Sequence, residues 1–278
     1  MDFTLKKYKI LLLALQSQGY LFQTFSEFLT SPLQKTIILR HDVDLRPYNS
    51  LKIAKIEKDL AIKSSYYFRI VPESWNLDVM EQIADLSHEI GYHYEDVDTA
   101  ITNYELRITN DKDKEKLIDV AYDCFCRNLE VFSKNFDIKT ICMHGSPRSN
   151  YDNKIIWSKY NYKDLGIIGE PYFDVDYDKV FYLTDTGRCW DGWKFSIRDK
   201  VDQQEKWNKK GLTFHSTGDI IKAVQNDKLP NQVMITTHPQ RWTDKPIPWT
   251  KELLWQNTKN IRKRSIVKKK IVSRRAAE

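Results

Sequence analysis

The chain has 278 residues, of which 29% are charged and 41% hydrophobic, a length that suits one large α/β domain or two small ones. Its net charge of +6 lies in the tail: residues 259–278 hold nine Lys/Arg and one Glu, while the other residues hold 35 basic and 37 acidic side chains. A nearly neutral body argues against a nucleic-acid-binding protein. Four cysteines without framework spacing, and no signal segment, indicate reduced thiols and a cytoplasmic setting.

Taken in chain order, the hydrophobic pattern predicts two helices, at 4–16 and 26–30, which together form an N-terminal helical cap over residues 1–30. Helices and strands then alternate, which favours parallel βα units and one barrel-like domain over residues 31–250. Strands are expected at 36–41, 64–71, 89–94, 139–144, 165–169, 180–184 and 232–238, and helices at 49–61, 77–87, 99–135, 152–160, 219–226 and 251–272.

Two carboxylates close the first of these strands, in the run Arg40-His41-Asp42-Val43-Asp44. Alternate side chains of an extended chain share a face, so Arg40, Asp42 and Asp44 point one way. Like charges that close are costly unless a cation or a shared proton joins them, and a divalent metal would resolve the conflict. The alternative is a solvated turn in which Asp44 caps the following helix.

Other polar side chains also follow predicted strands. His93 and Glu95 end the third strand, His144 ends the fourth and His238 ends the last. Because the carboxyl ends of parallel strands form the active site of a barrel or sheet, we expect these side chains to meet. The two remaining histidines, His88 and His215, are interpreted as structural.

Five short motifs carry a resemblance to a known family. The chain resembles the NodB-homology polysaccharide deacetylases, carbohydrate esterase family four, and more narrowly the branch associated with bacterial surface-polysaccharide gene clusters. The resemblance implies an α/β fold, a distorted (β/α)7 barrel, and metal-dependent removal of an acetyl group from an N-acetylated sugar. The motifs are Arg40-His41-Asp42-Val43-Asp44, Tyr66-Tyr67-Phe68-Arg69, His88-Glu89-Ile90-Gly91-Tyr92-His93, Met143-His144-Gly145-Ser146-Pro147 and Thr236-Thr237-His238-Pro239.

The resemblance also implies roles for individual residues. Asp42 matches the general base, Asp44 and His93 match ligands of a divalent ion such as Zn²⁺, and His238 matches the general acid. The family's second histidine ligand would fall on Val97, which binds no metal. A third ligand then comes from Glu95 or from His144, and proximity along the chain slightly favours Glu95.

Further residues are candidates for orienting the base or the sugar. Arg40, Arg69 and Arg148 are candidates to orient Asp42. Glu170 and Asp174 either line the sugar site or are ordinary loop acids. Trp190, in the run Trp190-Asp191-Gly192-Trp193, either forms an aromatic wall against a sugar ring or packs in the core.

The basic segment 251–278 has two interpretations. As a basic amphipathic helix it would contact an anionic membrane, where a lipid-linked glycan precursor would lie; otherwise it is a solvated terminal helix.

Two rival functions stay open as well. One is a glycan-binding protein that has lost the metal, which the valine at position 97 supports. The other is a metal-dependent amidase acting on a non-sugar amide.

Overall fold

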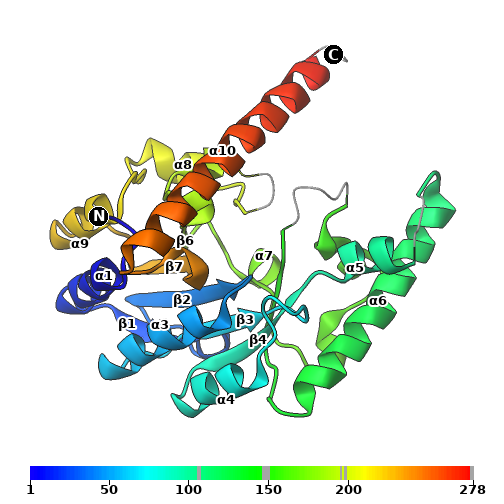
Figure 1. Ribbon diagram of the computed structural model, residues 1–278, viewed down its shortest axis with the longest axis horizontal. Helices are drawn as coiled ribbons and strands as arrows, with labels where there is room; N and C mark the ends of the chain where they lie inside the picture. The colour runs from blue at the N-terminus through cyan, green and yellow to red at the C-terminus, as the bar shows by residue number, and fades with distance from the viewer. Residues whose placement is uncertain (105–107, 146–150, 195, 197–198, 276–278) are drawn as a thin grey trace.

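The computed structural model describes residues 1–104, 108–145, 151–194, 196 and 199–275, with backbone only from residue 262 onward (Figure 1). Arg148 lies outside these residues. In the described part of the chain, all seven strands are parallel and form one sheet in the order β5-β4-β3-β2-β7-β6, with β1 beside the start of β2. The strands are β1 Leu21–Gln23, β2 Thr36–Val43, β3 Ser65–Phe68, β4 Glu89–Tyr94, β5 Ile141–Met143, β6 Phe181–Thr184 and β7 Gln232–Thr237.

The sheet curves into an incomplete barrel, so the predicted α/β class and distorted (β/α) barrel are confirmed. Strand β2 is its centre: β7 pairs along one edge, while β1 and then β3 share the other. Within the described residues, no ladder joins β5 to β6, and the chain between them forms one isolated β-bridge, from Thr140 to Gly169. The expected strand at 165–169 is therefore wrong; a 3₁₀ turn at Tyr162–Leu165 ends in Gly166 with φ +80°, a conformation that interrupts an extended run.

Helices follow the strands and cover the outer surface of the sheet (Figure 1). The expected helix at 99–135 is two helices, α5 and α6. The side chain of Asn110 accepts a hydrogen bond from the backbone of Asp113, and this N-cap starts α6 afresh. The α-helices are α1 Leu5–Ser17, α2 Phe25–Thr30, α3 Pro47–Asp59, α4 Leu77–Asp85, α5 Asp96–Asn103, α6 Asp111–Ser133, α7 Pro171–Asp174, α8 Gln204–Lys209, α9 Thr217–Gln225 and α10 Pro246–Arg275.

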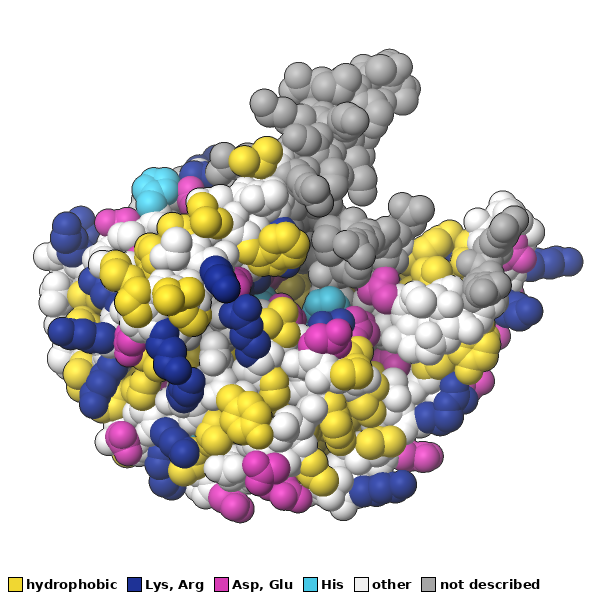
Figure 2. All heavy atoms as spheres, in the orientation of Figure 1, with side chains coloured by type: hydrophobic (Ala, Val, Ile, Leu, Met, Phe, Trp, Pro, Cys, Tyr) yellow, Lys and Arg dark blue, Asp and Glu magenta, His cyan; other side chains and the backbone are white. Residues whose placement is uncertain are grey.

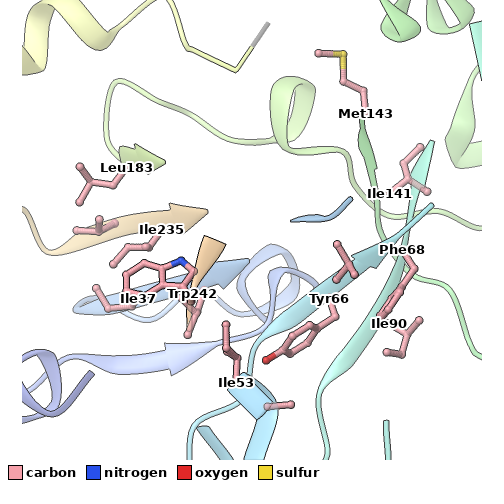
Figure 3. Close-up of a cluster of buried hydrophobic side chains, with 14 of the residues drawn as sticks. Ile37, Ile53, Tyr66, Phe68, Ile90, Ile141, Met143, Leu183, Ile235 and Trp242 are labelled. Atoms are coloured by element: carbon pink, nitrogen blue, oxygen red, sulfur yellow. The ribbon is translucent and has the colours of Figure 1, made fainter. Parts of the chain in front are cut away.

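The two faces of the sheet have different contents. On the outward face, aliphatic and aromatic side chains from successive strands pack beneath the helices; Figure 3 shows Ile37, Tyr66, Phe68, Ile90 and Ile235 in this cluster. A polar network is buried there as well. Glu57 of α3 lies 2.8 Å from His41 Nε2 and accepts hydrogen bonds from Tyr66, Ser64 and Tyr8. This network joins α1 and α3 to β2 and β3.

The inward face carries the polar side chains that the sequence singled out. Its lower part is filled by Tyr67, which crosses toward β4 at Gly91; a Cβ atom there would lie 2.9 Å from the Thr140 carbonyl oxygen and still closer to the Tyr67 ring. The glycine is thus required by packing. Above this layer, at the carboxyl ends of the strands, lie carboxylates, imidazoles and guanidinium groups.

Helix α10 closes the chain and projects from the body at its far end (Figure 1). Its first half is anchored: Glu252, Gln256 and Asn260 are buried, and Asn260 Nδ2 donates to the Gly187 carbonyl oxygen at 2.8 Å. Among the described residues, no helix has the length and apolar character needed to cross a membrane.

Candidate metal and proton-transfer site

The strand alternation brings most of the predicted site residues to one end of the sheet. Figure 2 shows histidine and acidic side chains together in a hollow near the middle of the face it displays. Parallel registers pair Arg40 with Thr236 across β2 and β7, and His93 with Cys142 across β4 and β5. Residues that follow these paired positions by two or four places therefore lie on the same face and converge at the strand ends. Those that meet are Arg40, Asp42, Asp44, Arg69, His93, Glu95, His144 and His238.

Asp44, His93 and His144 form a group whose ligand atoms all lie within 4.8 Å of one another. Oδ1 of Asp44 is 3.6 Å from His93 Nε2 and 3.7 Å from His144 Nε2. That oxygen is buried and has no hydrogen-bond partner among the described residues. A buried carboxylate oxygen facing two imidazole nitrogens, with nothing else to bind, fits a divalent cation. Three such ligands leave positions open for water and substrate.

The histidines also shape the charge of Asp44. Burial raises the pKa of the Asp44 carboxyl, but its contact with His93 and the charges of His238 and His144 outweigh that effect and hold the pKa well below its usual range. The His93 ring is fixed by its other nitrogen, which lies 2.9 Å from the Cys142 carbonyl oxygen. Nδ1 thus serves the backbone and Nε2 faces the carboxylates.

Glu95 lies beside this group and is not part of it. Its carboxylate accepts two hydrogen bonds from Arg69, at 2.9 and 2.6 Å, and one of its oxygens is 3.1 Å from His144 Nδ1. Burial raises the pKa of Glu95, whereas His144 and Arg69 lower it to about 2. Proximity along the chain slightly favoured Glu95 over His144 as the third metal ligand. The structure instead groups His144 with Asp44 and His93. After β4 ends at Tyr94 the backbone turns into α5, which aims Glu95 at Arg69.

Asp42 is the second carboxylate of the site. Arg40, only 1% exposed, donates from Nη2 to Asp42 Oδ2 at 3.1 Å. The other oxygen, Oδ1, is buried without a hydrogen-bond partner in the described part of the chain. Asp42 Oδ2 also lies 3.9 Å from His93 Nε2. Asp42 is thus held by a buried guanidinium at one oxygen while the other is free to accept a proton.

His238 lies across the site, and its partner Asp185 was not foreseen. His238 Nδ1 is 2.6 Å from Asp185 Oδ1, and Asp185 also accepts from Arg241 at 2.7 Å and from the Trp242 indole at 2.7 Å. Burial and the charge of Arg241 lower the pKa of His238, but the charge and hydrogen bond of Asp185 prevail and raise it. Asp185 directly follows β6, so the strand-end rule applied to the other strands would have found it.

Three other predicted residues, Trp190, Glu170 and Asp174, do not take part in the site. Trp190 is 2% exposed, donates to Thr217 at 3.0 Å and packs on Phe3 and Trp242, so the aromatic wall is wrong and the core interpretation holds. Glu170 is fully buried and accepts hydrogen bonds from the backbone of Met143 and Tyr172. Its role is therefore structural, and it does not line a sugar site. Asp174 accepts from Tyr162 and from the Glu170 amide, as a loop acid does.

Comparison with known proteins finds only distant structural similarity. No protein-family model matches the chain, and no curated protein does. Two solved structures align with 83% of this chain: BA3943, a CE4 family pseudoenzyme from Bacillus anthracis, and a mutant of BA3943 with restored enzymatic activity. Each is 14% identical with a TM-score of 0.38, and the alignments cover 62% and 64% of those chains, less than two thirds of their length. At this distance neither neighbour assigns an activity or a residue role to the chain.

Proposed function

We propose that this protein is a divalent-metal-dependent hydrolase that removes the N-acetyl group from an amino sugar of a bacterial surface polysaccharide or its precursor. The observation that carries the proposal is the position of Asp44. Its Oδ1 faces His93 and His144, and its Oδ2 lies 3.9 Å from His238 Nε2. One carboxylate thus joins a candidate metal group to a candidate proton donor, with Asp42 adjacent.

Asp44, His93 and His144 would hold the metal. A divalent ion bound by these three side chains supplies Lewis-acid polarisation of the acetyl carbonyl and a lowered pKa for the attacking water. Gln240 adds a fixed contact, because its Nε2 donates to Asp44 Oδ2 at 3.0 Å. This hydrogen bond occupies the Asp44 oxygen that faces His238 and leaves Oδ1 for the cation.

Asp42 is the proposed general base. Its unpartnered, buried Oδ1 accepts the proton of the attacking water, while Arg40 holds Oδ2 and fixes the direction of the carboxylate. Arg40 is itself buried, so the pair is isolated from competing solvent. A base held in this way contributes about 10²–10⁴-fold to such a step.

His238 is the proposed general acid. Asp185 accepts from Nδ1, so Nε2 is the nitrogen that faces the site and donates a proton to the departing sugar amine. An amine is too basic to leave as an anion, so the reaction requires this proton. Asp185 supports the role because it stabilises the protonated ring and thereby raises the pKa of His238.

A metal-free glycan-binding protein on the same fold is the second candidate, and the buried Val97 supports it because a family ligand is missing there. The acid and base pairs at the site count against it. Metal content separates the two. We expect about one divalent ion per purified chain, retained in the wild type and lost in His93→Ala. No metal in the wild type, even with added Zn²⁺ or Co²⁺, would favour the binding protein.

The substrate class needs its own experiment. Acetate release from sugar-nucleotide and lipid-linked N-acetyl sugars, measured beside small cyclic amides, distinguishes a sugar deacetylase from an amidase acting on a non-sugar amide. We expect release from the N-acetyl sugars and none from the cyclic amides. Release from the cyclic amides alone would support metal-dependent amide hydrolysis but would contradict an N-acetyl sugar as the substrate.

A further inference from the structure

Glu95 occupies a fixed position between two neighbours. Arg69 binds both of its oxygens, through Nε at 2.9 Å and Nη2 at 2.6 Å. The remaining guanidinium nitrogen, Nη1, donates to the backbone oxygen of Asp44 at 3.1 Å. The planar guanidinium thus links the end of β2 to the end of β4 and sets the orientation of the carboxylate.

The same carboxylate faces the imidazole of His144. Glu95 Oε2 lies 3.1 Å from His144 Nδ1, a close ion-pair contact that is not a hydrogen bond in this geometry. No described residue forms a hydrogen bond to that nitrogen. On the far side of the ring, Nε2 lies 3.7 Å from Asp44 Oδ1. The imidazole therefore lies between the carboxylates of Glu95 and Asp44.

The backbone of His144 is already fixed. Its amide donates to the Tyr94 carbonyl oxygen at 2.8 Å, and its carbonyl oxygen accepts from Asn153 Nδ2 at 2.8 Å. Rotation of the ring is the freedom that remains. His93 solves the same problem differently, since its Nδ1 lies 2.9 Å from a backbone carbonyl. Each imidazole thus has an oxygen close to Nδ1, the Cys142 carbonyl for His93 and the Glu95 carboxylate for His144, and presents Nε2 to Asp44.

We propose that Glu95, locked by Arg69, is the positioning residue of His144, and that His144 supplies the third protein ligand in place of the histidine missing at Val97. The inference rests on the proposed function insofar as it requires a metal at the site. Glu95 acts through His144 and does not bind the ion itself, because both of its oxygens are already held by a guanidinium. A carboxylate on the non-ligating nitrogen of a histidine fixes the tautomer and raises the basicity of the ligand.

The expected effect is on metal affinity. Loss of a partner of this kind costs about 10–100-fold in metal affinity. Co²⁺ and Zn²⁺ are titrated into the full chain as wild type, Glu95→Gln, Glu95→Ala, His144→Ala and the double variant Glu95→Ala/His144→Ala. We expect Glu95→Gln to weaken binding within that range and Glu95→Ala to add no further loss once His144 is absent. The visible spectrum of bound Co²⁺ should change in His144→Ala, as it does when a nitrogen ligand is lost.

A matched control is available in Glu252→Gln. Glu252 is another shielded carboxylate paired with an arginine, 3.6 Å from Arg46, and belongs to α10 rather than to the site. The Glu252→Gln substitution should leave the metal affinity unchanged. Thermal unfolding of the metal-free proteins reports whether each variant folds; the isosteric Glu95→Gln keeps the test valid where Glu95→Ala does not fold.

The outcomes separate this inference from the proposed function. Equal affinity in Glu95→Gln and wild type overturns the positioning role. A further tenfold or larger loss from Glu95→Ala in the His144→Ala background overturns it too, since Glu95 would then act as an independent ligand. A wild type that shows the expected affinities but releases no acetate from N-acetyl sugars overturns the proposed hydrolase and supports the positioning role. A wild type that binds no metal overturns both.

Discussion

Asp185 Oδ1 lies 2.6 Å from His238 Nδ1, and the carboxylate is fully buried between that ring, Arg241 and the Trp242 indole. The two residues come from neighbouring strands, β6 and β7, whose ends meet at this point. The pair therefore joins two parts of the sequence 53 residues apart in the unit that we propose as the proton donor.

Replacing Asp185 by Asn should impair the acid step. The isosteric amide keeps the packing but removes the charge that raises the pKa of His238. We expect a fall in kcat of about 10²–10⁴-fold. The alkaline limb of the pH profile should also move to lower pH, because the ring loses its proton earlier. Steady-state acetate release between pH 5 and 9 measures both; an unchanged alkaline limb would exclude Asp185 from this role.

Asp42→Asn tests the base. The amide accepts no proton from water, so turnover should fall by about 10²–10⁴-fold or more. Folding and metal content should survive, because the ligand atoms of Asp44, His93 and His144 are untouched. Near-normal turnover in this variant would show that another group takes the proton.

Asp96 should make stability depend on pH. Burial raises the pKa of its carboxyl to about 7 despite hydrogen bonds from Tyr92 and Asn128. Because the unfolded pKa is near 4, the folded protein binds the extra proton between about pH 4 and 7. The contribution of this group to the free energy of unfolding therefore falls as pH rises through that window, by at most about 1.4 kcal/mol per pH unit.

Asp96→Asn should flatten this dependence. Urea unfolding at pH 5 and pH 8 measures the difference for wild type and variant. Glu170, whose pKa burial also raises to about 7, acts in the same direction, so Glu170→Gln should flatten it further. An Asp96→Asn protein with the wild-type pH dependence would mean that the carboxyl is ionised throughout the range.

Glu57 is expected to matter for stability and not for chemistry. It is fully buried, and the charge and hydrogen bond of His41 lower its pKa to about 2 although burial raises it. Glu57→Gln breaks a buried charged network, which costs roughly 3–5 kcal/mol in the free energy of unfolding. Acetate release per folded molecule should stay at the wild-type level. Loss of turnover without loss of stability would place Glu57 in the reaction instead.

The strand pattern predicted the fold well because parallel βα units leave a strong imprint. The run 36–43 is largely apolar, and alternation alone predicts that Asp42 and Asp44 at its end share a face with Arg40. The divided helix at 96–133 was missed because residues 104–110 carry no proline or glycine; a cap at Asn110 ends the continuity.

The site could be predicted only in part, because contacts between strand ends depend on register. His144 and Glu95 were both plausible neighbours of the metal, and only the orientation of the turn after Tyr94 separates them. Trp190 has the composition of a sugar platform, but its neighbours are Phe3 and Trp242 from the two ends of the chain, which no local pattern reveals. Asp185 was overlooked although the rule that found His238 also applies to it.

The central position of β2 divides the site into two halves. The metal group is assembled from β2, β4 and β5, on one side of β2, and is complete by residue 144. The proposed proton donor, His238, and its partner Asp185 directly follow β7 and β6, on the other side. The two proposed chemical tasks therefore lie in separate parts of the architecture, and substitutions on the β6–β7 side that abolish the proposed proton donation would leave the candidate cation site intact.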